Sequence, residues 1–266
     1  AWFQSFNKET GNQVNYQAVG SGAGVRQYHA KTVDFGASDG AVSDKKQKLP
    51  MVHVPMTGGA IVPAYNYPGC DAKMTQTQLA DVFLGKIINW SEFGCADKKI
   101  LTVYRSDGSG TTKGFTNSLS AFSREWKKTV GTGKSVQWPV GVGGKGNSGV
   151  AGTIQNQPGA IGYLNYGYVV GDKFQQVSLQ NKAGNFVKAN AKTNSHNESH
   201  NFTRTSPCIF HKEARTKNHT QKGKTSPLNA NHASANTKGS VSLNKSSQTR
   251  IYISCDCSCY VTCNIT

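Results

Sequence analysis

The chain of 266 residues lacks several features that would mark other classes of protein. No hydrophobic run approaches the length of about 20 residues that a bilayer-spanning helix needs, so no membrane-spanning segment is expected. Neither the zinc motif H-E-x-x-H nor the nucleotide motif G-x-x-x-x-G-K-[ST] occurs. Only His29 and His53 precede residue 190, and both read as surface or packing residues. We therefore expect no metal and no cofactor.

Acidic side chains are also scarce, with 14 Asp and Glu against 30 Lys and Arg and a formal charge of +16. A balance this basic can indicate nucleic-acid binding. Here the basic residues are dispersed, and the short pairs Lys45–Lys46 and Lys127–Lys128 are not interleaved with aromatic residues. The composition therefore favours a basic surface that attracts small anions, and we expect no nucleic-acid partner.

The most informative segment that is present runs from Arg105 to Thr112, with the sequence RSDGSGTT. It follows a short apolar run, Ile100 to Tyr104, that predicts a buried strand. It precedes a helical pattern with Phe115, Leu119 and Phe122 on one face. A glycine-rich turn between a strand and a helix directs backbone N–H groups and the positive end of the helix dipole at one point, where a small anion binds. The guanidinium of Arg105 and the hydroxyls of Ser109 and Thr111 add donors, and Gly110 permits close approach of a ligand.

Two further glycine-rich loops have a similar setting. Residues 14–19 alternate like a strand, and Gly20 to Gly24 then lead to a helix expected from Val25, which places Ser21 near its N-terminus. A third loop runs from Gly141 to Gly152. Each loop alone is typical of any α/β protein, but together they suggest helix N-termini that converge on one anion.

Asp39 indicates which anion would bind. An ionised carboxylate only accepts hydrogen bonds, so beside an anion it requires a ligand that carries a proton. Phosphate at neutral pH has such a proton and sulfate does not, so Asp39 would discriminate against sulfate. Considered alone, Asp39 reads as an ordinary helix-capping or turn aspartate.

Seven blocks that include these loops occur in an order that resembles the periplasmic phosphate-binding proteins of bacterial phosphate ABC importers, over about residues 1–190. The blocks are YQAVGSGAG at 16–24, DFGASD at 34–39, LGKI with Trp90 at 84–90, RSDGSGT at 105–111, VGTG at 130–133, GGKGN at 143–147 and GAIGY at 159–163.

This resemblance implies an α/β fold with two lobes, a Venus-flytrap arrangement that holds phosphate between them. Lobe one would comprise residues 1–60 and lobe two residues 61–190, with the hinge near residues 58–62. Carried over residue by residue, the resemblance implies that Asp39 accepts the phosphate proton and that Asp107 orients Arg105. The phosphate-binding residues would be Ser21, Asp39, Arg105, Ser109, Gly110 and Thr111.

The resemblance further implies a periplasmic monomer that is not an enzyme and that delivers inorganic phosphate to the membrane permease of an ABC importer. The alternative is a phosphate-ester hydrolase or phosphoryl-transfer enzyme that uses the same anion-binding loops. In an exported lobe, Cys70 and Cys95 would form one disulfide. The late cysteines at 255, 257, 259 and 263 do not have a common zinc-finger spacing, and no metal site is expected there.

Both ends of the chain depart from the family pattern. The chain has no signal peptide and begins with Trp2, Phe3 and Phe6 in what reads as the middle of the helix after the family's first strand and glycine-rich loop, so we expect a truncated N-terminus. Residues 191–266 contain 30 Ser, Thr or Asn in 76 positions but two glycines and no tryptophan. Such a segment buries too little apolar surface to fold. It is a natural disordered extension, a divergent C-terminal lobe or an out-of-frame or mis-joined translation, and we favour the last.

Overall fold

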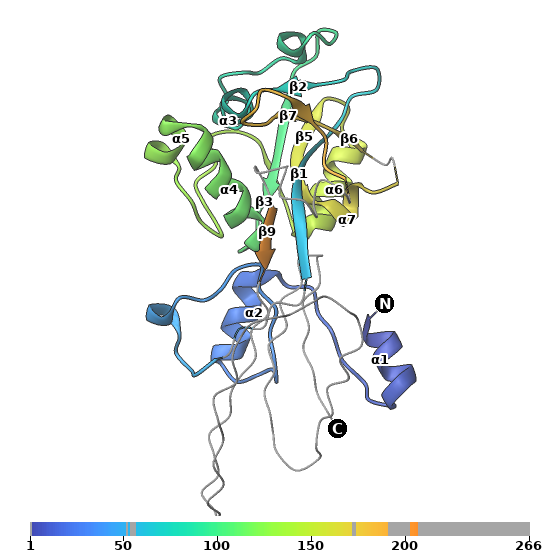
Figure 1. Ribbon diagram of the computed structural model, residues 1–266, viewed down its shortest axis with the longest axis vertical. Helices are drawn as coiled ribbons and strands as arrows, with labels where there is room; N and C mark the ends of the chain where they lie inside the picture. Colours follow the sequence, from blue (N-terminus) through green and yellow to red (C-terminus); the bar gives the residue numbers. More distant parts are fainter. Residues whose placement is uncertain (1, 52, 54–56, 172–173, 191–202, 207–266) are drawn as a thin grey trace, which may run out of the picture.

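The computed structural model describes residues 2–51, 53, 57–171, 174–190 and 203–206. Figure 1 shows a mixed α/β architecture in which a body built around a sheet lies above a smaller group of helices and loops. We call residues 57–171, 174–190 and 203–206 the sheet body, and residues 2–51 and 53 the N-terminal region. The predicted α/β class is confirmed.

The main sheet of the body mixes parallel and antiparallel pairs. Strand β3 pairs in parallel with both β4 and β5, while β1 pairs antiparallel with β5, β6 and β9. The carboxyl ends of β3, β4 and β5 therefore meet at one edge, the usual place for a ligand site in a sheet of this kind. In sheet order the strands are β4 (Val142–Gly144), β3 (Leu101–Arg105), β5 (Ala160–Asn165), β1 (Thr57–Asn66) and β6 (Gln175–Gln176), with β9 (Thr203–Ser206) beside the first residues of β1.

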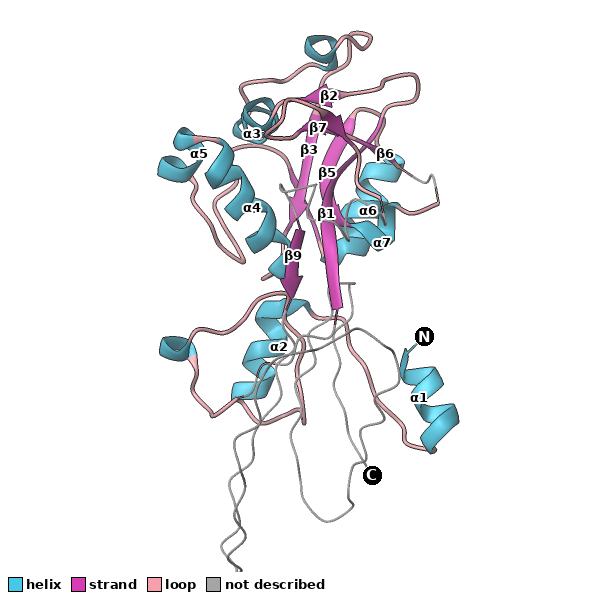
Figure 2. Ribbon diagram, in the orientation of Figure 1, coloured by secondary structure: helices cyan, strands magenta, loops and turns pink. Residues whose placement is uncertain are grey.

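Helices cover the sheet on both sides (Figure 2). On one side lie α3 (Gln76–Leu84), α4 (Gly110–Phe122) and α5 (Arg124–Thr129), and on the other lie α6 (Gly146–Asn156) and α7 (Tyr166–Val169). The apolar stripe predicted after the Arg105–Thr112 segment becomes α4, with Phe115 and Leu119 fully buried. The strand predicted before that segment is β3. Both predictions are confirmed.

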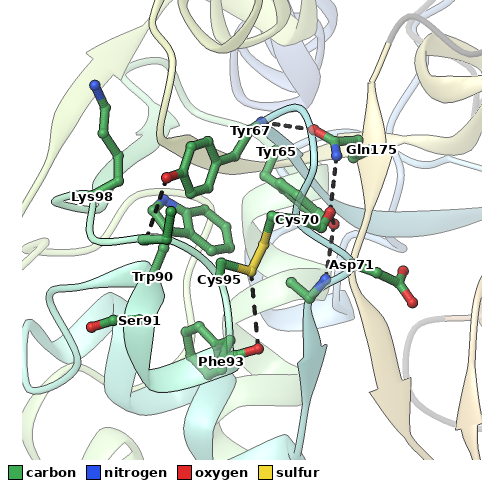
Figure 3. Close-up of a disulfide and its surroundings, with 12 residues drawn as sticks. Tyr65, Tyr67, Cys70, Asp71, Trp90, Ser91, Phe93, Cys95, Lys98 and Gln175 are labelled. Atoms are coloured by element: carbon green, nitrogen blue, oxygen red, sulfur yellow. Dashed lines mark hydrogen bonds between the residues drawn. A yellow bond between two sulfur atoms is a disulfide. The ribbon is translucent and has the colours of Figure 1, made fainter.

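A disulfide closes the end of the sheet body that lies away from the N-terminal region. Cys70 and Cys95 are bonded, with their Cα atoms 5.2 Å apart, as predicted. Gln175 braces the turn that contains Cys70, because its side chain accepts from Tyr67 N–H and donates to Cys70 C=O (Figure 3). The same end carries the short helix η2 (Trp90–Phe93) and a small sheet of β2 (Lys73–Met74), β7 (Ser178–Gln180) and β8 (Phe186–Val187).

The N-terminal region contains α1 (Trp2–Thr10), α2 (Gly20–His29) and the short helix η1 (Asp44–Lys46). Gly11 follows α1 with a φ of 74°, the left-handed conformation in which glycine commonly ends a helix. The strand predicted over residues 14–19 is wrong, because this segment is irregular. Its alternating apolar side chains pack against the small core around Tyr28, but no neighbouring strand is described that could complete a ladder.

Two predicted loop boundaries also need correction. Helix α2 begins at Gly20 rather than at Val25, so Ser21 lies inside its first turn. The loop predicted from Gly141 to Gly152 is mostly regular, since it contains β4 and the first half of α6. Residues 58–62, where the hinge is expected, lie within β1.

The predicted tail begins at residue 191, and most of it lies outside the described residues. Its four described residues form β9, which pairs with Thr57 to Ala60, and the prediction for the tail as a whole stays a prediction. The four late cysteines also lie outside the described part of the chain. None of the described helices is long and apolar enough to cross a bilayer.

Candidate functional site

The guanidinium of Arg105 is fixed by a two-point clamp at the carboxyl end of β3. Arg105 is 3% exposed, and its Nε and Nη2 donate to the two carboxylate oxygens of Asp107 at 2.7 and 2.6 Å. Two parallel hydrogen bonds to one carboxylate fix the plane of a guanidinium as well as its position. The structure thus places Asp107 where it can orient Arg105, the arrangement that the resemblance implies.

Asp107 also caps the N-terminus of α6. Its Oδ1 accepts a hydrogen bond from Gly146 N–H at 3.0 Å. Burial alone would raise the pKa of Asp107, but the hydrogen bonds and charge of Arg105, with the Gly146 N–H, outweigh burial and lower that pKa. Asp107 therefore stays ionised, and it ties the end of β3 to the start of α6.

Tyr163 holds the backbone of the same arginine by a hydrogen bond, a role that the sequence did not reveal. Its buried hydroxyl accepts Arg105 N–H at 3.0 Å and lies 2.7 Å from Thr112 Oγ1. Burial raises the pKa of Tyr163, so it remains a neutral phenol. The residue belongs to the GAIGY block, but only the pairing of β5 with β3 shows that its hydroxyl joins the end of β3 to the first turn of α4.

The first turn of α4 contains the three predicted donors. Ser109 is the N-cap, and its hydroxyl accepts Thr112 N–H at 3.1 Å. Gly110 begins the helix, and Thr111 is buried with its Oγ1 3.5 Å from Asp39 Oδ2. The positive end of the helix dipole is therefore directed at the Asp39 side chain. Ser109 thus has a structural role as a cap, which the sequence prediction did not include.

The N-terminal region contributes Ser21 and Asp39 to the same point. The fully buried Ser21 hydroxyl accepts Asp39 N–H at 3.1 Å and is hydrogen-bonded to the Asp39 carboxylate. Burial raises the pKa of Asp39 to about 6, although Arg105, Lys134 and the hydroxyls of Ser21 and Thr111 all act to lower it. Asp39 is therefore mostly an acceptor at neutral pH, and it gains a proton under mildly acidic conditions.

The two parts of the molecule touch through glycines. Gly22 N–H donates to Gly108 C=O at 2.8 Å, which joins the first turn of α2 to the loop after β3. A Cβ atom added to Gly110 would lie 2.4 Å from Asp39 Cβ and 2.5 Å from Ser21 Oγ. Only glycine at position 110 allows this approach, which brings all six predicted binding residues to one seam between the N-terminal region and the sheet body.

Lys134 is a further charged residue of this seam that sequence reasoning missed. It follows directly after the VGTG block, in the turn beyond α5, and its Nζ lies 3.4 Å from Ser38 Oγ. Burial, the repulsion of Lys113 and smaller contributions from other cations lower its pKa to about 8, while Asp39 opposes that shift. No local pattern distinguishes Lys134 from the other dispersed lysines, since its position depends on how the two parts meet.

The spacing of a few residues near the seam also matches a motif found in hydrolases. Residues 36–40 match G-x-S-x-G, but they are irregular rather than a turn between a strand and a helix. The Ser38 hydroxyl donates to Gly40 C=O at 2.8 Å. His53 Nε2 accepts Val42 N–H and His29 Nε2 accepts Lys48 N–H, so both histidines hold backbone, as predicted for packing residues. No cluster of three metal-ligating side chains occurs within the described ranges.

Comparison with protein families gives a match to a PBP superfamily domain over residues 1–221. Among curated proteins, the phosphate-binding protein PstS of Pasteurella multocida is 46% identical over 205 residues, which is 72% of this chain and 60% of the relative. PstS of Methanocaldococcus jannaschii is 35% identical over 218 residues, covering 72% of this chain and 56% of the relative. The chain thus spans about 60% of the length of the curated relatives it matches.

Solved structures show the same fold. A Clostridium perfringens structure with bound phosphate, provisionally assigned as a phosphate ABC transporter substrate-binding protein, superposes with a TM-score of 0.65 at 22% identity over 79% of each chain. An ABC-type phosphate transport receptor from Vibrio cholerae gives a TM-score of 0.54 at 19% identity, covering 79% of this chain and 80% of the receptor.

Proposed function

Because this chain belongs to the PBP superfamily, we propose that it binds inorganic phosphate at the seam between the N-terminal region and the sheet body and delivers it to a phosphate ABC importer. In this proposal the N-terminal region belongs to lobe one, residues 1–60, and most of the sheet body to lobe two, residues 61–190, while residues 57–60 form the start of β1. One observation carries the proposal: the buried acceptor Asp39 faces Arg105 and the start of α4 across the seam. A site with strong donors on one side and an acceptor on the other suits an anion that retains a proton.

The roles proposed for the individual residues follow from their chemistry. Arg105, held in plane by Asp107, would bind two ligand oxygens at once. The N–H groups of Gly110 and Thr111 at the helix start, with the hydroxyls of Ser21, Ser109 and Thr111, would donate to the remaining oxygens. Asp39 would accept the ligand's proton. The Ser21 and Thr111 hydroxyls that now face Asp39 need only rotate to reach a ligand.

The cellular setting belongs to the proposal as well. A periplasmic location, a permease of an ABC importer as partner and a monomeric state are the arrangement expected for a protein of this kind. Closure of the two lobes around phosphate would exclude water and present one surface to the permease. The curated relatives carry the name of a phosphate-binding protein, and no observation favours the ester-hydrolase or phosphoryl-transfer alternative.

Exchange of Asp39 for Asn tests the proposal. In the wild type, sulfate would face Asp39 with no hydrogen between two acceptors, whereas an amide can donate to it. Asp39→Asn should reduce the preference for phosphate over sulfate by about 100-fold, since an unpaired buried polar contact costs about 1–3 kcal/mol. Isothermal titration calorimetry with both anions measures the ratio.

The matched control is Asp34→Asn, an equal loss of charge in the same segment, which should keep the selectivity. The same experiment has a stability readout. Because burial raises the pKa of Asp39 to about 6, ionised Asp39 disfavours folding above that pH. Asp39→Asn should therefore raise the unfolding midpoint without ligand at pH 8, and this gain should shrink as the pH falls through 6. Unchanged selectivity in Asp39→Asn would overturn the role of Asp39.

A further inference from the structure

Lys134 belongs to the sheet body, but its side chain reaches into the N-terminal region. Its C=O accepts Ser109 N–H at 2.8 Å, which fixes its backbone beside the cap of α4. Its ammonium donates to Ser38 Oγ at 3.4 Å, one residue before Asp39. The charge of Lys134 is therefore positioned by the same loop that supplies the ligand-binding helix start.

We propose that Lys134 determines specificity in the phosphate site. Its ammonium keeps the Asp39 carboxylate ionised, so the carboxylate accepts a hydrogen bond from the ligand and cannot donate one. This inference rests on the proposed function, and it adds a residue outside the set of groups that would contact phosphate. Lys134 would act through Asp39, so it is a positioning residue rather than a ligand.

The charges around Asp39 support this role. Two cations act on its carboxylate, Arg105 from β3 and Lys134 from the turn after α5. The charge of Arg105 is already matched by Asp107 at hydrogen-bonding distance. Among the residues that the structure describes, Lys134 has no carboxylate within ion-pair distance, and its charge adds to the larger effect of Arg105 in stabilising ionised Asp39.

The charges around Lys134 determine the pH range in which its side chain is protonated. Lys113 on α4, Lys46 on η1 and Arg26 on α2 all repel its ammonium, and Asp39 attracts it. Together with burial, this repulsion lowers the pKa of Lys134 to about 8, so Lys134 is still mostly charged at neutral pH. Asp39 and Lys134 are therefore both ionised between about pH 6 and pH 8, the range in which phosphate must be distinguished from sulfate.

Lys113 offers a matched comparison on the same seam. Its Nζ lies 3.6 Å from the position of a Cβ atom built on Gly40, so it also crosses from the sheet body to the residues beside Asp39. Its charge also acts on Lys134, whose pKa it lowers. Loss of Lys113 removes one seam cation and leaves in place both Asp39 and the hydrogen bond from Lys134 to Ser38.

The test is the pH profile of phosphate affinity in Lys134→Met, Lys134→Arg and Lys113→Met, by calorimetry from pH 5 to pH 9. In the wild type, affinity should fall as the pH drops through about 6, because Asp39 gains a proton. In Lys134→Met this fall in affinity, the acidic limb of the profile, should begin about one pH unit higher. At a pH within the limb, phosphate should then bind about tenfold more weakly than in the wild type. Lys134→Arg should restore the wild-type profile, and Lys113→Met should leave the limb in place.

A second measurement does not depend on phosphate. Carboxyl carbon NMR can follow the titration of Asp39 with pH in the unliganded protein. The titration midpoint should be near pH 6 in the wild type and higher in Lys134→Met. If Lys134→Met does not fold, Lys134→Gln takes its place. A wild type that binds no phosphate would overturn the proposed function, while the NMR midpoints still decide the coupling. Phosphate binding by the wild type with an unmoved limb and midpoint in Lys134→Met would overturn the role of Lys134 alone.

Discussion

The N-terminal region and the sheet body contribute opposite kinds of group to one site. The sheet body supplies cations and donors from a well-packed scaffold, in which Arg105, Asp107 and Tyr163 hold one another by hydrogen bonds. The N-terminal region supplies the acceptor Asp39 from an irregular segment, with a small core of Tyr28, Val33, Phe35 and Val42. Under the proposed function, the packed part would attract the anion, and the part with little core of its own would select between anions.

This division has a physical reason. Donors must be held in a fixed geometry to favour one tetrahedral anion, which rigid elements do best. If the site opens and closes, the acceptor Asp39 must move away from the donors and back again. Such movement suits a region joined to the sheet body through few contacts, such as the Gly22–Gly108 hydrogen bond. Three changes to the chain test this division of roles, and their expected effects on phosphate affinity decrease from the first to the last.

Gly110→Ala should have the largest effect, because it separates the two parts while leaving each intact. The added Cβ atom would lie about 2.5 Å from both Asp39 and Ser21, and neither contact is with the far end of a flexible side chain. Overpacking of this kind costs about 1–3 kcal/mol, so we expect phosphate to bind about 100-fold more weakly in calorimetry.

The control for Gly110→Ala is Gly152→Ala in α6, where an added Cβ atom meets nothing within 4 Å. That variant should bind phosphate normally and be slightly more stable, since alanine favours a helix over glycine. Equal affinity in Gly110→Ala and the wild type would show that the seam is not the binding site.

Arg105→Lys tests whether the sheet body works by geometry or by charge alone. Lysine keeps the charge but loses the planar fork that Asp107 holds at two points. A charge-assisted hydrogen bond contributes about 1.5–3 kcal/mol, so phosphate affinity should fall about 30-fold. Arg124→Lys, at an exposed arginine of α5, should change nothing. If Arg105→Lys bound phosphate as tightly as the wild type, Arg105 would only pack.

Removal of the disulfide should affect stability far more than binding. The bond between Cys70 and Cys95 closes a loop with a sequence separation of 25, and it lies at the end of the sheet body away from the seam. The double change of both cysteines to Ser should lower the free energy of unfolding by about 3 kcal/mol in denaturant titration.

Phosphate affinity of this double variant should stay within about twofold of the wild type, because the six proposed binding residues lie outside the loop that the disulfide closes. Wild-type protein treated with a reductant should behave in the same way. A large loss of affinity would mean that the site depends on the stability of the whole body, and the contrast between the two parts would be weaker than we infer.

Local sequence predicted the sheet body better than the N-terminal region. Strand β3 and helix α4 follow from short-range patterns, because a buried strand, a glycine-rich turn and an apolar stripe are fixed by neighbouring residues. Residues 14–19 alternate as a strand would, but a strand also needs a partner. The strand β9 could not be predicted from its own composition either, since it exists through pairing with β1.

The sequence by itself determined the chemistry of this protein: a guanidinium, a helix start rich in donors and a carboxylate, each identifiable from residue type and local spacing. Only the tertiary structure decided that Asp39 meets Thr111, that Tyr163 supports Arg105 and that Lys134 reaches Ser38. These contacts join residues 58 to 96 positions apart, and no local pattern encodes them. The physical reason is that burial and the surrounding charges, which exist only in the folded chain, set the pKa of Asp39 and thus its ability to accept a proton.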